Sequence, residues 1–170
     1  MTPQIDLVSA TCEVMLLGLL MAGAISDLVQ FKLPNWLTLA TALVGVPWVI
    51  LSFPLWPTAT LHVLAAGLML LIGILAFRWK VLGGGDAKWL AAIALWVGFG
   101  VDLMRFLMLT TIFGGILGLA VLVVGRIWPS YGMQDGKRHL PYGIAIALAG
   151  LDFWFRRGHL AQQLMALQAS

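Results

Sequence analysis

Charged residues are scarce in this chain: Asp, Glu, Lys and Arg make up only 10% of its 170 residues. Soluble domains carry about 25% of these residues. The shortage, together with 61% hydrophobic residues and a mean hydropathy of +0.98, excludes an ordinary soluble fold. The sequence therefore predicts an all-α integral membrane protein, with residues 1–170 forming a single domain of packed transmembrane helices.

Cysteine is nearly absent as well. Cys12 is the only one, which excludes an intrachain disulfide and any metal site built from several cysteines. We expect Cys12 to pack as a small apolar residue in the first membrane span. The first six residues contain no Lys or Arg, so the basic start of a cleavable signal peptide is missing, and we expect the first apolar run to be a retained helix.

The small charge excess is positive, with a formal net charge of +3 and an isoelectric point of about 9.4. In a soluble protein such a charge would suggest nucleic-acid binding. Here most Lys and Arg lie in short connections between apolar runs, where they orient membrane proteins in the bilayer. We therefore expect membrane lipid around the chain and no nucleic-acid partner.

Long apolar runs fill the sequence, and a membrane span needs about 20 such residues. We expect six spans, near residues 8–25, 36–55, 59–77, 87–99, 103–124 and 140–155. Pro47 and Pro54 predict kinks in the second span. A single tilted span with an interfacial helix is the alternative for the fourth and fifth. Residues 159–170 are mildly amphipathic, which suits either the membrane interface or a frayed end.

The distribution of Lys and Arg predicts the orientation. With six spans, the connections after spans one, three and five share one side, and they hold seven of the ten Lys and Arg residues: Lys32, Arg78, Lys80, Lys88, Arg126, Lys137 and Arg138. The positive-inside rule then puts these connections in the cytoplasm and the N-terminus outside. Arg156 and Arg157, on the opposite side, weigh against this orientation.

Two aspartates stand at the margins of apolar runs. Asp27 ends the first run, and Asp86 directly follows three glycines, Gly83, Gly84 and Gly85. A carboxylate near the bilayer is costly, which makes each a candidate functional residue. Two spans separate them, so both must lie on the same face of the membrane. The segment 140–143 joins them there if the fourth and fifth spans are separate.

Each aspartate also has a simple structural explanation. Asp86 could cap the fourth span, and Asp27 could face lipid headgroups at a helix end. Pro34 stops the first helix from continuing, and Asn35 could cap the second. Lys32 could tune nearby acids, although lysines beside membranes usually contact phosphates. The same holds for Lys88.

As a pair, the two acids could carry chemistry. Two carboxylates a few ångströms apart share one proton. The ionised member can then take a proton from water, while the protonated member polarises a peptide carbonyl. This is general acid–base hydrolysis, which needs neither a metal nor a covalent intermediate. The three glycines would permit close approach of another chain, and we expect them to let an extended substrate strand lie beside the catalytic backbone.

Three segments together resemble the prepilin peptidases, membrane aspartyl proteases of bacteria with archaeal preflagellin relatives. They are the G-x-G-D segment ending at Asp86, Asp27 followed by residues 32–35, and residues 140–145. The resemblance spans residues 16–150 and implies that Asp27 and Asp86 form the catalytic pair. It also implies that ten residues shape the substrate site: Lys32, Pro34, Asn35, Gly83, Gly84, Gly85, Lys88, Pro141, Tyr142 and Gly143.

The resemblance further implies an activity and a cellular location. The family removes the short basic leader of pilin-like precursors at the cytoplasmic face of the bacterial inner membrane, without metal or cofactor. Its larger members also methylate the new N-terminus, using an extra domain with paired Cys-x-x-Cys motifs. This chain has only Cys12 and no room for that domain, so it resembles the short, peptidase-only branch of tight-adherence (Flp) pilus systems.

Other functions remain open at this point. Presenilin-type intramembrane proteases share G-x-G-D, but they have Tyr before the first Asp and a later Pro-Ala-Leu, where this chain has Ser26 and Pro141-Tyr142-Gly143. A small ion-coupled transporter would use buried acids such as Glu13 and Asp152. A non-catalytic assembly subunit is the third alternative.

For the remaining polar residues we favour structural roles. Glu13 and Asp152 are expected to pair with polar neighbours, and His62 has no nearby metal ligands in the sequence. Asp102 and Arg105 are spaced to pair on one helix face. Glycines at 114, 115 and 118 predict close helix packing in the fifth span.

Overall fold

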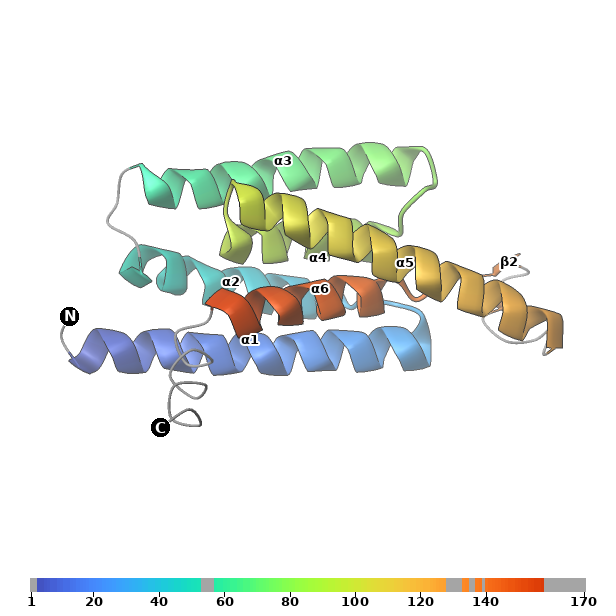
Figure 1. Cartoon of the computed structure of the whole chain (residues 1–170), viewed down its shortest axis with the longest axis horizontal. Helices are drawn as coiled ribbons and strands as arrows, with labels where there is room; N and C mark the ends of the chain where they lie inside the picture. The colour runs from blue at the N-terminus through green and yellow to red at the C-terminus, as the bar shows by residue number, and fades with distance from the viewer. Residues whose placement is uncertain (1–2, 53–56, 128–132, 135–136, 139, 158–170) are drawn as a thin grey trace.

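The computed structural model describes residues 3–52, 57–127, 133–134, 137–138 and 140–157. Pro54 and the segment 159–170 lie outside the described residues. Within the described part, six helices run alternately in opposite directions (Figure 1). They are α1 (Pro3–Gln30), α2 (Asn35–Ser52), α3 (Thr58–Arg78), α4 (Gly84–Val97), α5 (Val101–Ile127) and α6 (Tyr142–Arg157), and two short strands, β1 (Met133–Gln134) and β2 (Lys137–Arg138), pair between α5 and α6.

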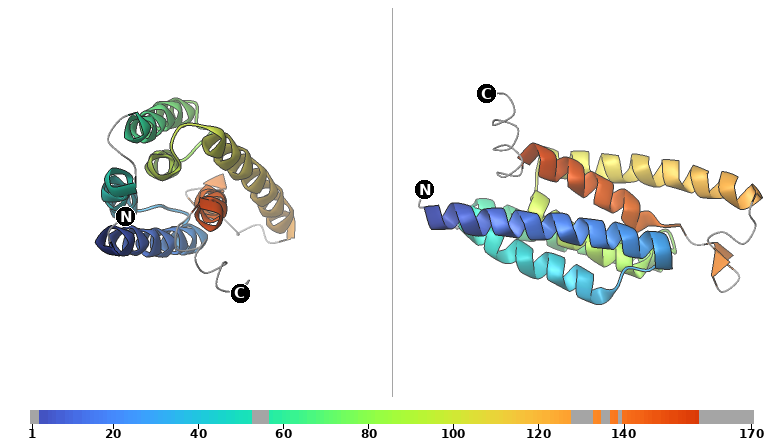
Figure 2. Two further views of the ribbon diagram at one scale, coloured as in Figure 1. Left: turned by 60° about the vertical axis from the view of Figure 1, so that its left-hand side comes forward. Right: turned by 90° about the horizontal axis from the view of Figure 1, so that it is seen from below.

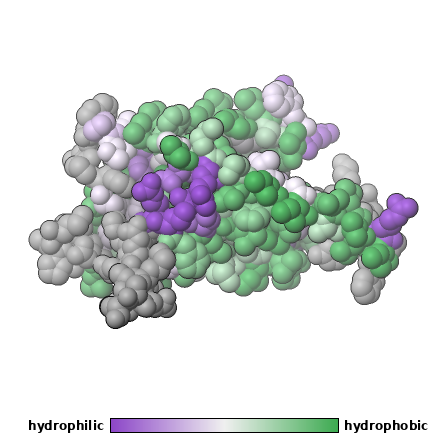
Figure 3. Space-filling view, in the orientation of Figure 1, coloured by the Kyte–Doolittle hydropathy of each residue, from purple (hydrophilic) through white to green (hydrophobic). Residues whose placement is uncertain are grey.

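This arrangement confirms the prediction of an all-α membrane protein. Four of the described helices, α1, α2, α3 and α5, are long and apolar enough to cross a membrane, whereas α4 and α6 have only 14 and 16 residues. Large apolar side chains such as Val63, Leu71 and Leu119 are exposed on the outside of the bundle. Figure 3 shows this apolar surface on one face of the molecule, where it suits contact with lipid.

Helix α4 lies at the centre of the bundle. Its residues Trp89–Val97 are all buried, as expected of a helix that is apolar on every side. Helices α2, α3, α5 and α6 surround it (Figure 2). The two indole N–H groups of α4 are satisfied by α2: Trp89 Nε1 donates to Thr41 Oγ1 (3.1 Å) and Trp96 Nε1 donates to the Thr41 carbonyl (3.0 Å).

A glycine-rich turn separates α4 from α5, and the buried position of α4 favours two separate helices in the bundle over one tilted span with an interfacial helix. Gly98 adopts a φ of +73°, which only glycine reaches easily, and α5 begins at Val101. The ring of His62 packs against Gly98, and its Nδ1 lies 2.8 Å from the Leu95 carbonyl oxygen. His62 therefore has a structural role at this turn.

Ion pairs join α5 to α6 at the end of the bundle that holds the α4–α5 turn. Arg105 pairs with Asp152 (3.0 Å), and Arg156 pairs with both Asp152 (2.9 Å) and Asp102 (3.0 Å). The expected pairing of Asp102 with Arg105 along one helix is wrong, because each acid binds an arginine of the neighbouring helix instead. These residues form a polar patch in the apolar surface (Figure 3), and Asp152 has the structural role predicted for it.

Glu13 is also held by structural contacts. It is 1% exposed, and its Oε1 accepts a hydrogen bond from Trp48 Nε1 of α2 (3.4 Å). Trp154 Nε1 of α6 donates to the Glu13 backbone carbonyl (3.1 Å). The prediction that Glu13 pairs with a polar neighbour is confirmed, as is the packing of Cys12 in the apolar core.

Helices approach closely where glycine replaces a side chain. Gly23 of α1 lies against the Trp89 ring, and Gly114 of α5 lies against the Tyr142 ring. The prediction of close packing in the fifth span holds for Gly114 only. Gly115 is exposed with no described atom near the position of a Cβ, and Gly118 has ordinary contacts of 3.8 Å or more with Leu140.

We expect Gly23→Ala to lower the stability of the folded protein, because the added methyl group would collide with the Trp89 ring. Overpacking of this kind costs about 1–3 kcal/mol. Gly18→Ala on the same helix is the matched control, since its Cβ would meet no described atom, and it should be neutral or stabilising. Melting temperatures in detergent test this; equal values for the two variants would contradict the packing.

Candidate active site

The connection between α1 and α2 is short and tightly held. Helix α1 ends at Gln30, and Phe31 takes a left-handed conformation (φ 52°) with its N–H bonded to the Asp27 carbonyl (3.0 Å). The Ser26 hydroxyl donates to the Lys32 carbonyl (2.9 Å), and Pro34 directly precedes α2. The turn therefore closes over Asp27 and fixes it at the end of the bundle.

The carboxyl group of Asp27 lies against the N-terminus of α6. It is 3% exposed, and the backbone N–H groups of Gly143 and Ile144 hydrogen-bond to it. Both donors lie in the first turn of α6, where a helix N-terminus favours a negative charge, and the Ile144 N–H is shared with the Pro141 carbonyl. The Asp27 Oδ2 has no hydrogen-bond partner among the described residues. A Cβ at position 143 would lie 2.8 Å from this oxygen, so glycine makes the contact possible.

Asp86 stands in the first turn of α4, just after the extended Gly83. Its carboxyl group accepts a hydrogen bond from the Gly83 N–H, and a Cβ on Gly83 would lie 2.5 Å from its Oδ2. An acid at this helix position that reaches back to the residue before the helix stabilises the helix start. Asp86 thus supports α4, and it is still partly exposed.

The two carboxyl groups line one pocket of about 430 Å³ and interact electrostatically. Six of the predicted site-shaping residues line the same pocket: Lys32, Pro34, Asn35, Gly83, Gly84 and Gly85. The prediction from span counting, that Asp27 and Asp86 share one end of the bundle, is therefore confirmed. One ionised and one protonated carboxyl group here could activate water against a peptide carbonyl.

The other four predicted site residues surround this pocket without lining it. Lys88 lies two residues after Asp86 on α4, and its Nζ donates a hydrogen bond to Asn35 Oδ1 (3.0 Å), a contact within the protein that does not involve lipid phosphates. The ring of Tyr142 packs on Gly114 and interacts electrostatically with Asp86. Gly143 contacts Asp27, and Pro141 is buried at the start of α6, where its carbonyl accepts the Ile144 N–H (3.3 Å).

Of the three glycines, Gly85 brings the start of α4 against the α1–α2 connection. A Cβ on Gly85 would lie 3.0 Å from the Leu33 carbonyl oxygen and 3.1 Å from Leu33 Cβ. A Cβ on Gly84 would instead meet the Phe77 ring at 3.3 Å. Any side chain at position 85 would therefore push the segment that carries Asp86 away from the segment that carries Asp27.

Sequence reasoning missed several residues that build the pocket. Gln30, Phe31 and Leu33 line it, and Ser26 and Ile144 hold it together. The position of Gln30, three residues after Asp27, was a usable signal, because residues at that spacing share a helix face. The part played by the Ile144 backbone had no sequence signal, since every residue except proline carries an N–H.

We expect a disulfide to form between Leu33→Cys and Gly85→Cys in a Cys12→Ser background. The Cβ positions at 33 and 85 are 3.1 Å apart, near the separation of about 3.5–4.5 Å in disulfides. Leu33→Cys with Gly84→Cys is the control, because position 84 faces Phe77. Maleimide labelling after mild oxidation should show two protected thiols only in the 33/85 variant; equal protection in both would contradict the observed approach.

Comparison with protein families adds to this geometry. The sequence matches the type IV leader peptidase family over residues 14–123, which is more than half of the chain. The matched region includes Asp27, Asp86 and the pocket-lining glycines, and it ends before the α6 segment. Comparison with curated proteins and with solved structures gave no significant match. On the strength of the family match, this multi-pass membrane protein belongs to the type IV leader peptidase family.

Proposed function

We propose that the protein is an aspartic endopeptidase that removes the short basic leader from prepilin-like precursors at the cytoplasmic face of the bacterial inner membrane. The observation that carries the proposal is the pocket at the end of the bundle, which Asp27 and Asp86 share in a member of the leader peptidase family. Such a precursor presents a basic leader followed by an apolar helix, so its junction lies at the membrane edge.

The surroundings of the two acids suggest separate roles. Burial disfavours the negative charge of Asp27, but the N–H groups of Gly143 and Ile144 offset part of this cost, and its unpartnered Oδ2 can accept a proton from water. Asp86, which interacts with this negative charge, holds the shared proton and donates a hydrogen bond to the peptide carbonyl. Both roles require only the two carboxyl groups and one water molecule.

The reaction balances without a further reactant. Water gives a proton to Asp27 while its oxygen bonds to the carbonyl carbon, and the carbonyl oxygen takes the proton of Asp86. The C–N bond then breaks, the leaving nitrogen takes the proton held by Asp27, and the carbonyl re-forms as its proton returns to Asp86. Each aspartate thus both accepts and donates a proton, which is general acid–base catalysis.

The distribution of basic residues supports the cytoplasmic face. The end of the bundle that holds the pocket also carries Lys32, Arg78, Lys80 and Arg126, at the ends of α1, α3 and α5. The positive-inside rule puts that end in the cytoplasm and the N-terminus outside.

The short α1–α2 connection supports cleavage without methylation. Only residues 31–34 separate α1 from α2, which leaves no space for the cysteine-rich domain of the bifunctional enzymes between these helices. This fits the peptidase-only branch of tight-adherence pilus systems. The transporter alternative is less well supported, because the Glu13 carboxyl group accepts a hydrogen bond from Trp48 and Asp152 pairs with Arg105 and Arg156.

We expect Asp27→Asn and Asp86→Asn each to reduce cleavage of a prepilin-like precursor by a factor of about 10²–10⁴, the usual contribution of general acid–base groups. Asp102→Asn is the matched control, since Asp102 binds Arg156 and Arg157 at the other end of the bundle. The control should retain turnover. Full processing by either pocket variant in detergent micelles would disprove the assignment of the pair.

The rate of cleavage should depend on pH as a bell-shaped curve. At low pH both carboxyl groups are protonated and no base remains to activate water; at high pH both are ionised and no acid remains to polarise the carbonyl. Activity therefore requires the singly protonated pair. Initial rates measured across pH 4–9, about the range in which buried carboxyl groups titrate, test this; a curve that rises monotonically would exclude a shared proton.

A further inference from the structure

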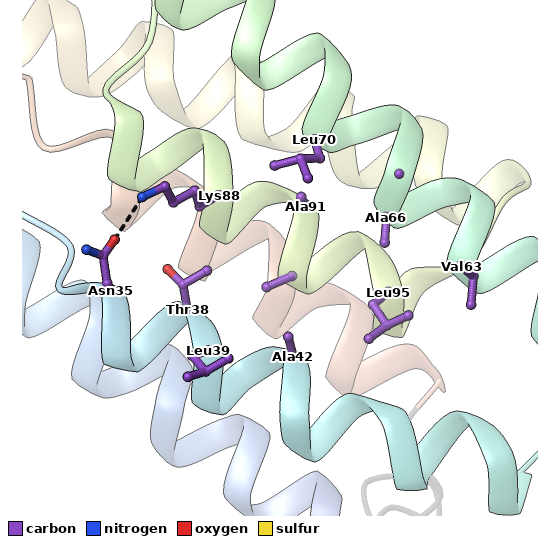
Figure 4. A pocket seen from close by; sticks show the side chains of 12 residues that line it. Asn35, Thr38, Leu39, Ala42, Val63, Ala66, Leu70, Lys88, Ala91 and Leu95 are labelled. Carbon is purple, nitrogen blue, oxygen red and sulfur yellow. Dashed lines mark hydrogen bonds between the residues drawn. The ribbon is translucent and has the colours of Figure 1, made fainter.

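A second hollow lies on the membrane-facing side of the bundle, between α2 and α3. It has a volume of about 610 Å³ and is lined almost entirely by apolar side chains, as Figure 4 shows. Its walls come from residues 35–42 of α2 and 63–70 of α3, and residues 88–95 of α4 form its floor. We call this hollow the α2–α3 groove.

The groove exists because α2 packs on α1 and α4, α3 packs on α4, and α2 and α3 hardly touch each other. Small residues line its sides and floor, among them Ala42, Ala66, Gly67, Ala91 and Ala92. A Cβ at Gly67 would meet no described atom, so the groove is open to the outside at this point. Small residues on a membrane-embedded surface let another helix approach closely.

The groove adjoins the pocket that holds the two acids. Asn35 lines both, and its side chain is bonded to Lys88, which lies at the same end of the groove (Figure 4). From there the groove runs along the bundle toward Leu95 and Val63. A chain cut in the pocket could therefore continue directly into the groove.

We propose that the α2–α3 groove binds the apolar helix of the precursor immediately after the cleaved bond. The proposal rests on the proposed function. The lining segments of α2 and α4 are each about two helical turns long, and a helix about 10 Å wide would place one face in the groove and the other in lipid. The precursor residues just before this helix would thereby hold the scissile bond at Asp27 and Asp86.

A helix fits these observations better than a lipid tail. An acyl chain packs against any apolar surface, whereas small residues at successive positions on α3 and α4, with Ala42 on α2, matter for the close approach of another backbone. The continuity with the pocket is also explained, because the precursor is the one molecule whose apolar helix begins at the cleavage site.

Filling the groove should weaken binding of the precursor while leaving the chemistry intact. We expect Gly67→Leu to raise KM about tenfold, equivalent to about 1.4 kcal/mol, with kcat little changed. Gly115→Leu on α5 is the matched control, because it too is exposed with no described atom near its Cβ, and it should leave KM unchanged. Equal KM values for the two variants would overturn the proposal.

A cross-linking experiment separates this proposal from the proposed function. A photoreactive label is attached to Gly67→Cys or Gly115→Cys in a Cys12→Ser, Asp27→Asn protein, and illuminated with a precursor. We expect the label at position 67 to form adducts with the precursor, in the first two helical turns after its cleavage site. The label at position 115 should form none there. If the unlabelled wild type cleaves the precursor but position 67 labels only phospholipid, the groove proposal fails and the proposed function stands. If the wild type cleaves no precursor, the proposed function fails, whatever the label shows.

Discussion

The contact between Asp27 and the first turn of α6 is the interaction on which the candidate site depends. It joins the first helix to the last, and it gives a buried carboxylate two backbone donors in a membrane protein, where an unsatisfied charge would be costly. The contact requires a residue without a side chain at position 143, since a Cβ would lie 2.8 Å from Asp27 Oδ2. The N-terminus of α6 thus holds the acid, and the acid in turn supplies an acceptor to first-turn N–H groups of the helix.

The position of the second acid follows from the central helix. Residues Trp89–Val97 of α4 are buried on every side, so packing fixes the helix and sets the depth of Asp86 in its first turn. Its glycines then allow the closest approach to the α1–α2 connection, with Gly85 against Leu33. Both acids are therefore held by packing of helix ends, a rigid arrangement that suits acid–base chemistry.

The sequence was sufficient for the topology and for the pairing of Asp27 with Asp86, because counting two spans between them requires no knowledge of packing. It placed the start of α4 at Ala87, three residues late, because glycines usually interrupt helices. The capping role suggested for Asp86 is exerted from within the first turn, through its hydrogen bond with Gly83, instead of from the residue before the helix. The sequence paired Asp102 with Arg105 on one helix, whereas both bind α6. Contacts between helices depend on tertiary packing, which hydrophobic patterns do not specify.

The relation of the α2–α3 groove to the pocket also explains why two helices of the bundle remain apart. Close packing of α2 on α3 would bury more apolar surface within the protein, but membrane lipid is as apolar as the side chains, so leaving them apart costs little. The separation keeps Asn35 and Lys88 at the junction of groove and pocket. A substrate that arrives as a helix within the bilayer could then reach the acids sideways, without passing through the interior of the bundle.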